Sequence, residues 1–204
     1  MKNRTAIVIL AAGKSSRIGT PKQLLPWGET TLLGNAIEQA LLIPDAEVFV
    51  VLGAYRQSIQ KEISKYPLSI IVHEHWSHGV GSSIAKAVKE IESLASYTQV
   101  LITLADQPFI GSVFLNKLLD CYKREAAEIM ATTYKDIAGV PVVFSKKYFD
   151  GLKQLKADKG AKSLIHKYKD IVTYCSVSSP FEDVDTLEAY AALKKVYERQ
   201  KNFK

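Results

Sequence analysis

Cysteines and long apolar runs are scarce in this chain. Only two of its 204 residues are cysteines, Cys121 and Cys175, and they are far apart in the sequence and belong to no CxxC pair. A disulfide framework is therefore not expected. No apolar stretch approaches the length of a membrane-spanning helix, and the first residues lack the long apolar segment and the cleavage pattern of a secretory signal. We expect a cytoplasmic protein that does not contact a membrane.

Low-complexity tracts and nucleic-acid motifs are also lacking. The net charge is +6, and part of the excess lies in the last eleven residues, KKVYERQKNFK. A basic balance indicates nucleic acid, a membrane surface or small anions as partners. The chain has no RNA-binding aromatic motif and no recognisable helix-turn-helix pattern. We therefore expect small anionic ligands and no nucleic acid.

Short apolar runs alternate with segments of helical periodicity. The expected strands are 6–10, 48–52, 69–73, 100–104, 129–132, 140–144 and 171–177, and the expected helices lie around 33–41, 84–95 (capped by Ser82 or Ser83), 113–118 and 185–200. This alternation predicts an α/β protein with a mostly parallel sheet covered on both faces. The length suits one domain over residues 1–204, and segment 133–169 is expected to be a less regular, antiparallel excursion over the site.

Ligands of such sheets bind at the carboxyl ends of strands, where this sequence places Gly13, Gly53 and Asp106. The loop after the first strand carries Gly13, Arg17 and Lys22, a combination that suits a polyphosphate. A P-loop is excluded because Val8 stands where its first glycine is required, and the glycines of the loop are too widely spaced for a dinucleotide fingerprint.

Residues 10–26, LAAGKSSRIGTPKQLLP, resemble the signature of nucleotidyltransferases of the molybdenum cofactor cytidylyltransferase type. They resemble more loosely the guanylyltransferases of that pathway and the sugar-nucleotide pyrophosphorylases. Residues 104–109, LADQPF, and 182–186, EDVDT, are similar to two further segments of the same family. The resemblance implies a Rossmann-like three-layer α/β/α fold with a mostly parallel central sheet.

The same resemblance implies roles for particular residues. Arg17 would bind the triphosphate, and Lys22 would neutralise the α-phosphate in the transition state. Asp106 and Asp185 would hold Mg²⁺, with Asp183 helping or orienting. A purely structural role stays open for both aspartates: Asp106 suits an N-cap or a turn, and Asp185 suits the N-cap of the last helix.

Further segments are implied to frame the two substrates. The nucleotide would contact Leu10, Ala11, Ala12, Gly13, Arg17, Lys22, Gly53, Gly79 and Ser83. The glycine turn 79–84 would help to bind the base, although capping of the following helix by Ser82 is the plain alternative. Residues 139–141, GVP, and the loop 158–162 would lie near the acceptor. In that loop Ala157 and Lys162 depart from the glycine and the arginine of the family pattern.

Three histidines, His73, His75 and His78, occur within six residues where many relatives have asparagine. They suggest zinc, but no fourth ligand with suitable spacing is visible, and a polar turn lining the site is the favoured interpretation.

These observations together predict a Mg²⁺-dependent nucleotidyltransferase. An acceptor phosphate would attack the α-phosphorus of a nucleoside triphosphate and release pyrophosphate. The resemblance and Ala12 favour CTP as donor and molybdopterin or its molybdenum form as acceptor, with a molybdenum hydroxylase receiving the product. A sugar phosphate or another small phosphate is the alternative acceptor. A non-catalytic protein that holds the cofactor is the rival from another class, and intact Arg17, Lys22, Asp106 and Asp185 argue against it.

Overall fold

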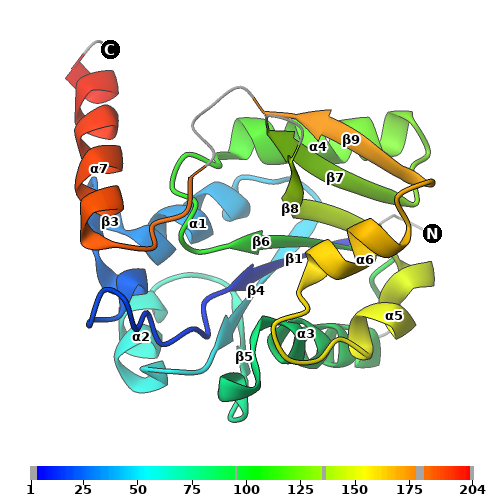
Figure 1. Ribbon diagram of the computed structural model, residues 1–204, viewed down its shortest axis with the longest axis horizontal. Helices are drawn as coiled ribbons and strands as arrows, with labels where there is room; N and C mark the ends of the chain where they lie inside the picture. Colours follow the sequence, from blue (N-terminus) through cyan, green and yellow to red (C-terminus); the bar gives the residue numbers. More distant parts are fainter. Residues whose placement is uncertain (1–3, 95, 135–136, 178–181, 203–204) are drawn as a thin grey trace.

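The computed structural model describes residues 4–94, 96–134, 137–177 and 182–202. Its centre is a seven-stranded sheet with the strand order β5-β4-β1-β6-β8-β7-β9 (Figure 1). The strands of this sheet are β1 (Thr5–Leu10), β4 (Ala46–Leu52), β5 (Ser69–Val72), β6 (Gln99–Leu104), β7 (Ile129–Tyr134), β8 (Ile137–Ser145) and β9 (Val172–Ser176). All seven expected strands are therefore present, and no end differs from the expected one by more than three residues.

The sheet has a parallel part and a mixed part. Strand β1 pairs in parallel with β4 on one side and β6 on the other, and β5 continues the parallel order beyond β4. Strand β8 runs antiparallel to both β6 and β7, whereas β9 is parallel to β7. The antiparallel strand lies within the segment 133–169 for which such an excursion was predicted, and residues 135 and 136 of that segment lie outside the described residues.

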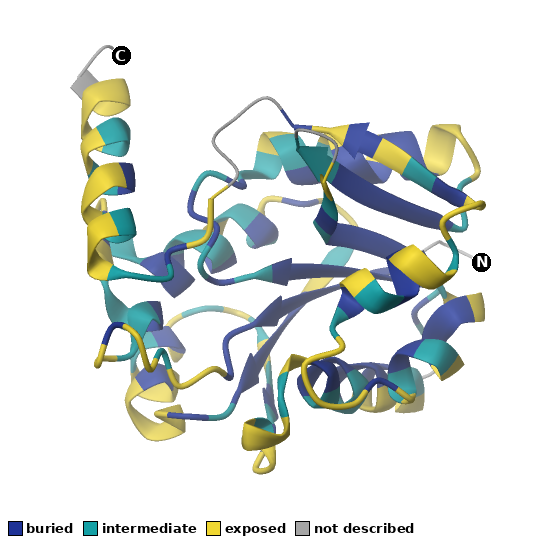
Figure 2. Cartoon of the chain, viewed as in Figure 1, coloured by how far each residue is buried: buried dark blue, intermediate teal, exposed yellow. Residues whose placement is uncertain are grey.

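Helices cover both faces of the sheet. They are α1 (Leu32–Leu41), α2 (Arg56–Ile63), α3 (Val80–Ser93), α4 (Ser112–Arg124), α5 (Phe149–Lys153), α6 (Ala161–Lys167) and α7 (Leu187–Asn202), with the short 3-10 helices η1 (Lys22–Leu24), η2 (Trp76–His78) and η3 (Lys146–Tyr148). Side chains of β1 alternate between two cores. Ile7 and Ile9 pack with α1, α2 and α4, and Val8 packs with α3, α5 and α6. Figure 2 shows the strands as the buried layer between two sets of half-exposed helices, which confirms the predicted three-layer fold.

A small third core joins the chain's last helix to its first loop. The two-stranded hairpin β2 (Pro26–Trp27) and β3 (Thr30–Thr31) places Trp27 against Phe109 and Tyr197, with ring centroids 5.6 and 4.9 Å apart. Val184 and Leu193 belong to the same cluster. In Figure 1 helix α7 stands away from the sheet and reaches the rest of the molecule through this hairpin. The contact brings the segment before α7 beside the loop that follows β1.

Two details of the helix predictions are wrong. Helix α3 begins at Val80 with Gly79 at the N-cap, so Ser82 and Ser83 lie inside its first turn and neither caps it. In α4 the buried residues are Leu115, Leu118, Leu119, Cys121 and Tyr122. In α7 Leu193 is buried, whereas Val113 of α4 and Leu187 of α7, two apolar residues of the predicted periodic segments, are 85% and 51% exposed. Periodicity alone did not reveal which side of each helix meets the sheet, because both helices carry apolar residues on more than one side.

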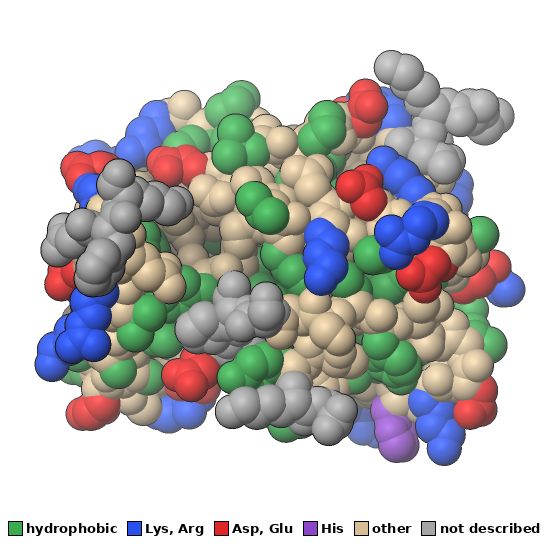
Figure 3. Space-filling view, turned by 90° about the horizontal axis from the view of Figure 1, so that it is seen from above, with side chains coloured by type: hydrophobic (Ala, Val, Ile, Leu, Met, Phe, Trp, Pro, Cys, Tyr) green, Lys and Arg blue, Asp and Glu red, His purple; other side chains and the backbone are tan. Residues whose placement is uncertain are grey.

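Two observations concern the surface and the cysteines. Within the described ranges no helix is both long enough and apolar enough to cross a membrane. Basic, acidic and apolar side chains are interspersed over the face seen in Figure 3. Cys121 and Cys175 are both buried and neither is in a disulfide.

A buried phenol makes the fold sensitive to alkaline pH. Burial, followed by the charge of Glu128, raises the pKa of Tyr122 from 10.0 to about 12. The folded protein thus holds this proton more tightly than the unfolded chain. The resulting stabilisation is fully present at a pH below the pKa of the unfolded chain, and it is lost as the pH rises through the pKa of the folded protein. Between about pH 9 and about pH 12 the wild type should lose on the order of 2 kcal/mol of its free energy of unfolding through this group, and Tyr122→Phe should not show that loss.

The measurement is the free energy of unfolding in urea for both proteins across that range. Tyr174→Phe, at an exposed tyrosine, is the matched control and should follow the wild type. Parallel curves for Tyr122→Phe and wild type would contradict the assignment.

Candidate active site

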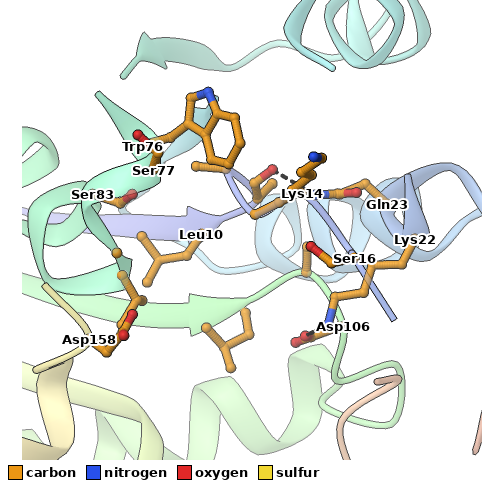
Figure 4. Close-up of a pocket in the computed structure, with 17 residues that line it drawn as sticks. Leu10, Lys14, Ser16, Lys22, Gln23, Trp76, Ser77, Ser83, Asp106 and Asp158 are labelled. Atoms are coloured by element: carbon orange, nitrogen blue, oxygen red, sulfur yellow. Dashed lines mark hydrogen bonds and ion pairs between the residues drawn. The ribbon is translucent and has the colours of Figure 1, made fainter. Parts of the chain in front are cut away.

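A cavity of about 390 Å³ opens at the carboxyl ends of β1 and β6, between the loop after β1 and the turn before α3 (Figure 4). The lining residues are Leu10, Ala11, Ala12, Gly13, Lys14, Ser16, Lys22, Gln23, Trp76, Ser77, Gly79, Val80, Ser83, Leu104, Ala105, Asp106 and Asp158. Eight residues predicted from the sequence to bind nucleotide or metal are among them: Leu10, Ala11, Ala12, Gly13, Lys22, Gly79, Ser83 and Asp106. Parallel strands end here together, so residues far apart in the sequence meet at one edge.

The loop after β1 is held in shape by a buried glutamine. Gln23 is 2% exposed, and its Nε2 donates to the carbonyl oxygens of Ala11 and Gly13, each at 2.9 Å. The hydroxyl of Ser15 donates to Oε1 of Gln23 at 3.3 Å, while the same oxygen of Ser15 accepts from the backbone N–H of Lys22 at 3.2 Å. Because Gln23 ties both ends of the turn together, the loop is organised without a ligand.

Lys22 joins the loop to two distant carboxylates. Its Nζ forms an ion pair with Oδ2 of Asp106 and a second with Oδ1 of Asp185 at 3.1 Å. It also donates to the carbonyl oxygen of Val184 at 3.0 Å. The backbone N–H of Val184 in turn donates to the carbonyl oxygen of Asp106 at 2.9 Å. Lys22 is therefore a neighbour of Asp106 and Asp185 in space, although it lies 84 and 163 positions from them in the sequence.

The charges of this cluster depend on one another. Burial disfavours the ammonium of Lys22, but the carboxylates of Asp106 and then Asp185 outweigh it and raise the pKa of Lys22 above 10.5. Burial raises the pKa of Asp106 above 3.8, and the charge of Lys22 offsets this only in part. The Asp106 carboxylate is thus short of positive charge, and a further cation at this point would stabilise its ionised form.

Asp185 is oriented by Arg17 as well as by Lys22. NH2 of Arg17 lies 2.9 Å from Oδ2 of Asp185. Burial alone would raise the pKa of Asp185, but Lys22 and Arg17 together lower it below 3.8. The side chain of Arg17 is 68% exposed, and neither it nor Asp185 lines the cavity directly. Arg17 thus occupies the entrance side of the cluster.

Helix capping is wrong for both aspartates, whereas Asp106 does lie in the turn that follows β6. The hydroxyl of Thr186 accepts from the backbone N–H of Ala189 at 3.1 Å, so Thr186 fills the capping position before α7 and leaves Asp185 free to face Lys22. Asp106 caps no helix, since the residue at the N-cap of α4 is Gly111.

The donor set fits a divalent metal ion bound together with phosphate. Oδ1 of Asp106 is buried and has no hydrogen-bond partner among the described residues. Carboxylate oxygens are the ligands that Mg²⁺ and Mn²⁺ prefer, and such ions are commonly held by one or two carboxylates plus substrate phosphates. Within the part of the chain that the structure describes, no group of three or more histidine, cysteine or acidic side chains is arranged to hold a metal. The remaining ligands would come from phosphate oxygens and water.

Two glycines at or beside the cavity have no room for a side chain. Gly53, after β4, does not line it, but a Cβ there would lie 2.4 Å from Cβ of Trp76 and 2.8 Å from the carbonyl oxygen of Ala12. Gly79 has φ +94°, in the region that favours glycine, and a Cβ there would meet the backbone of Ala157 at 2.5 Å. Both positions therefore require the smallest residue.

The histidine cluster lies beside the cavity. Nε2 of His73 is 2.9 Å from the hydroxyl of Ser82, which donates to the carbonyl oxygen of Gly79 at 2.7 Å. The rings of His75 and His78 stack with centroids 5.5 Å apart. Burial, and then the neighbouring His75, lower the pKa of His73, which keeps it neutral in this turn. The cluster supports the turn before α3.

A second cavity of about 220 Å³ lies next to the first and shares Leu104 with it. Its lining residues are Leu104, Gln107, Tyr134, Ile137, Val140, Lys162 and Asp183. Nε2 of Gln107 donates to Oδ1 of Asp183 at 2.8 Å, while Oε1 of Gln107 is buried with no hydrogen-bond partner among the described residues. Val140 and Lys162, which the sequence resemblance placed near an acceptor, both line this second cavity.

Comparison with known proteins shows the family to which the chain belongs. The model of the MobA-like NTP transferase domain matches residues 7–172. This chain belongs to the MobA-like NTP transferase family. The family resemblance predicted from residues 10–26 is thereby confirmed, and the chain is a nucleotidyltransferase by family.

The chain matches two curated relatives over nearly their full length. The chain is 31% identical over 194 residues to nicotine blue oxidoreductase of Paenarthrobacter nicotinovorans, covering 89% of this chain and 92% of that one. It is 28% identical over 198 residues to the purine catabolism protein PucB of Bacillus subtilis, covering 92% and 95%. The crystal structure of Rv0371c from Mycobacterium tuberculosis superposes with a TM-score of 0.85 and 31% identity over 96% of this chain and 99% of that one. Rv0371c has also been solved in complex with manganese, with a TM-score of 0.81.

Within this MobA-like domain, several cavity residues were missed by the sequence reasoning. They are Lys14, Ser16, Gln23, Trp76, Ser77, Val80, Leu104 and Ala105. All of these except Trp76 and Ser77 lie in the motifs quoted above, which were the available signal. Asp158 was expected near the acceptor, but it lines the first cavity beside Gly79, because the loop before α6 crosses the turn before α3.

Gly53 and Gly13 offer a matched comparison, because a Cβ is crowded at the first and has open space at the second. Nothing lies within 4 Å of a Cβ added at Gly13. We expect Gly53→Ala to lower the free energy of unfolding by about 1–3 kcal/mol, because Trp76 and Ala12 must move. Gly13→Ala should change it by less than about 0.5 kcal/mol. Urea unfolding followed by far-UV circular dichroism measures both, and equal stabilities of the two variants would contradict the close contact at Gly53.

Proposed function

We propose that this protein transfers a nucleoside monophosphate from a nucleoside triphosphate to a phosphorylated small molecule and releases pyrophosphate. The observation that carries the proposal is the meeting of Lys22 with Asp106 and Asp185 at one end of the larger cavity. A lysine held between two carboxylates next to a glycine-containing loop suits a substrate that brings both phosphates and a metal ion.

The triphosphate would lie along the loop after β1, where Gly13, Lys14 and Lys22 line the cavity. Asp106 and Asp185 would hold Mg²⁺, which would supply positive charge to neutralise the phosphates. The solved manganese complex of Rv0371c supports a divalent ion for this family member. Lys22, relieved of part of its charge pairing with the carboxylates, would reach the α-phosphate oxygens, on which charge develops in the transition state. Arg17, at the exposed side, would contact the outer phosphates.

The acceptor would occupy the second cavity. That cavity adjoins the first at Leu104 and is built from β7, β8 and the segment before α7. Lys162 offers a cation there, and Oε1 of Gln107 offers a buried acceptor for an N–H or O–H group. An acceptor phosphate that enters from this side approaches the α-phosphorus past Asp106, and no residue of the chain need act as a nucleophile.

CTP and molybdopterin, or its molybdenum form, are the substrates that we favour, with a molybdenum hydroxylase receiving the product. The signature at residues 10–26 and Ala12 support this choice. PucB, a relative over nearly its full length, is named for purine catabolism, and a molybdenum hydroxylase encoded beside this gene would add weight. Sugar phosphates are the alternative acceptors. The relative in P. nicotinovorans is named as an oxidoreductase, an activity that a pyrophosphate assay separates from transfer because a redox reaction releases none.

The decisive experiment measures pyrophosphate release from purified protein. We expect release with Mg²⁺, CTP and molybdopterin, less with the other triphosphates, and none after chelation of the metal. Asp106→Asn should abolish release while its urea unfolding transition is retained. Absence of release with every triphosphate across molybdopterin and a panel of sugar phosphates would overturn the proposal and favour the non-catalytic alternative.

The role of Lys22 has its own test. Lys22→Ala should lower kcat by about 10²–10³-fold with a smaller change in the KM for the acceptor, because the lysine acts mainly on charge that grows in the transition state. Lys86→Ala removes a lysine of an exposed pair with Glu90 on α3 and should leave kcat unchanged. An unchanged kcat for Lys22→Ala would remove this lysine from the chemistry.

A further inference from the structure

Asp158 is the one acidic residue at the end of the larger cavity opposite its lysines. Figure 4 shows Lys14 and Lys22 on one side of the cavity and Asp158 on the other, with Ser83 and Trp76 above it on the same side. A carboxylate repels phosphate, so the triphosphate is directed to the lysine side and the base to the side of Asp158. The cavity thus has an electrostatic direction that orients the nucleotide.

The loop that carries Asp158 is fixed against the turn before α3. The carbonyl oxygen of Ala157 accepts from the backbone N–H of Gly81 at 2.8 Å. Ala157 has φ 51°, a left-handed conformation that is unusual for alanine and that turns the next residue toward the cavity. A Cβ on Gly79 would lie 2.7 Å from Oδ1 of Asp158, so the carboxylate rests directly on this glycine. The position of Asp158 is therefore set by backbone contacts.

No hydrogen bond or ion pair of the Asp158 side chain is found within the described residues. The apolar walls near it come from Leu10, Trp76 and Val80, which suit the flat faces of a base. The hydroxyl of Ser83, whose residue is 4% exposed, lies on the same side of the cavity in Figure 4. A carboxylate that accepts hydrogen bonds, placed at the edge of an apolar slot, is suited to an amino group on the base edge.

We propose that Asp158 reads the donor base and selects one with an exocyclic amino group, such as cytosine, over uracil and thymine. The inference rests on the proposed function, since it assigns the base end of the same nucleotide site. The 4-amino group of cytosine donates to the carboxylate, whereas O4 of uracil at the same place brings two acceptor oxygens together. Discrimination follows from this unfavourable pairing as much as from the favourable one.

The test uses CTP and UTP, two ligands whose bases differ at the 4-position. Binding of each to the wild-type protein is measured by isothermal titration calorimetry with Mg²⁺ and without acceptor, so the readout does not depend on turnover. We expect CTP to bind at least about tenfold more tightly than UTP. Asp158→Asn supplies an amide that both donates and accepts, so UTP should gain affinity and the ratio should fall toward one. Asp158→Ala should weaken the binding of CTP and strengthen that of UTP, because it removes both the favourable and the unfavourable pairing.

Asp170→Asn, at an exposed aspartate after α6, is the matched control and should retain the wild-type ratio. Thermal melting of each variant reports whether it is folded. A wild-type ratio near one, or an Asp158→Asn ratio equal to that of the wild type, would overturn the role of Asp158 while leaving nucleotide binding established. Failure of the wild type to bind any triphosphate would instead overturn the proposed function and the inference with it.

Discussion

The contact of Lys22 with Asp106 and Asp185 is the interaction on which the arrangement of the site depends. It joins the loop after β1, the end of β6 and the segment before α7. The segment before α7 is held in place by the backbone hydrogen bond from Val184 to Asp106 and by the packing of Val184 with Trp27 and Leu193. Because a buried charge without a partner is costly, each of the three groups stabilises the positions of the other two.

The same cluster is balanced so that a substrate can rearrange it. Asp106 keeps one buried oxygen without a hydrogen-bond partner among the described residues, and its pKa is raised by burial despite the adjacent lysine. A metal ion bound together with a triphosphate would satisfy the carboxylates and the lysine at once. Both lysines that line the cavity lie at this end, and Asp158 lies at the opposite end.

Much of the fold was predictable because buried parallel strands leave a plain signal. The continuous apolar runs 6–10, 48–52 and 100–104 became β1, β4 and β6 at the centre of the sheet. Gly13, Lys22 and Asp106 were predicted for the site and line the same cavity. The hairpin of β2 and β3 and the helices α2, α5 and α6 were not predicted, because such short elements depend on tertiary packing more than on local pattern. The buried sides of α4 and α7 were misjudged for the same reason.

The sequence by itself determined the class of the fold, the family and the loop that lines one side of the larger cavity, because these follow from local patterns of apolar, glycine and charged residues. Only the tertiary structure decided that Thr186 caps α7 and so releases Asp185 to Lys22. It also decided that Gln23 braces the loop and that Asp158 lines the larger cavity while Lys162 lines the smaller one. These outcomes depend on which segments meet across the end of the sheet, and no spacing within a single stretch of chain records that meeting.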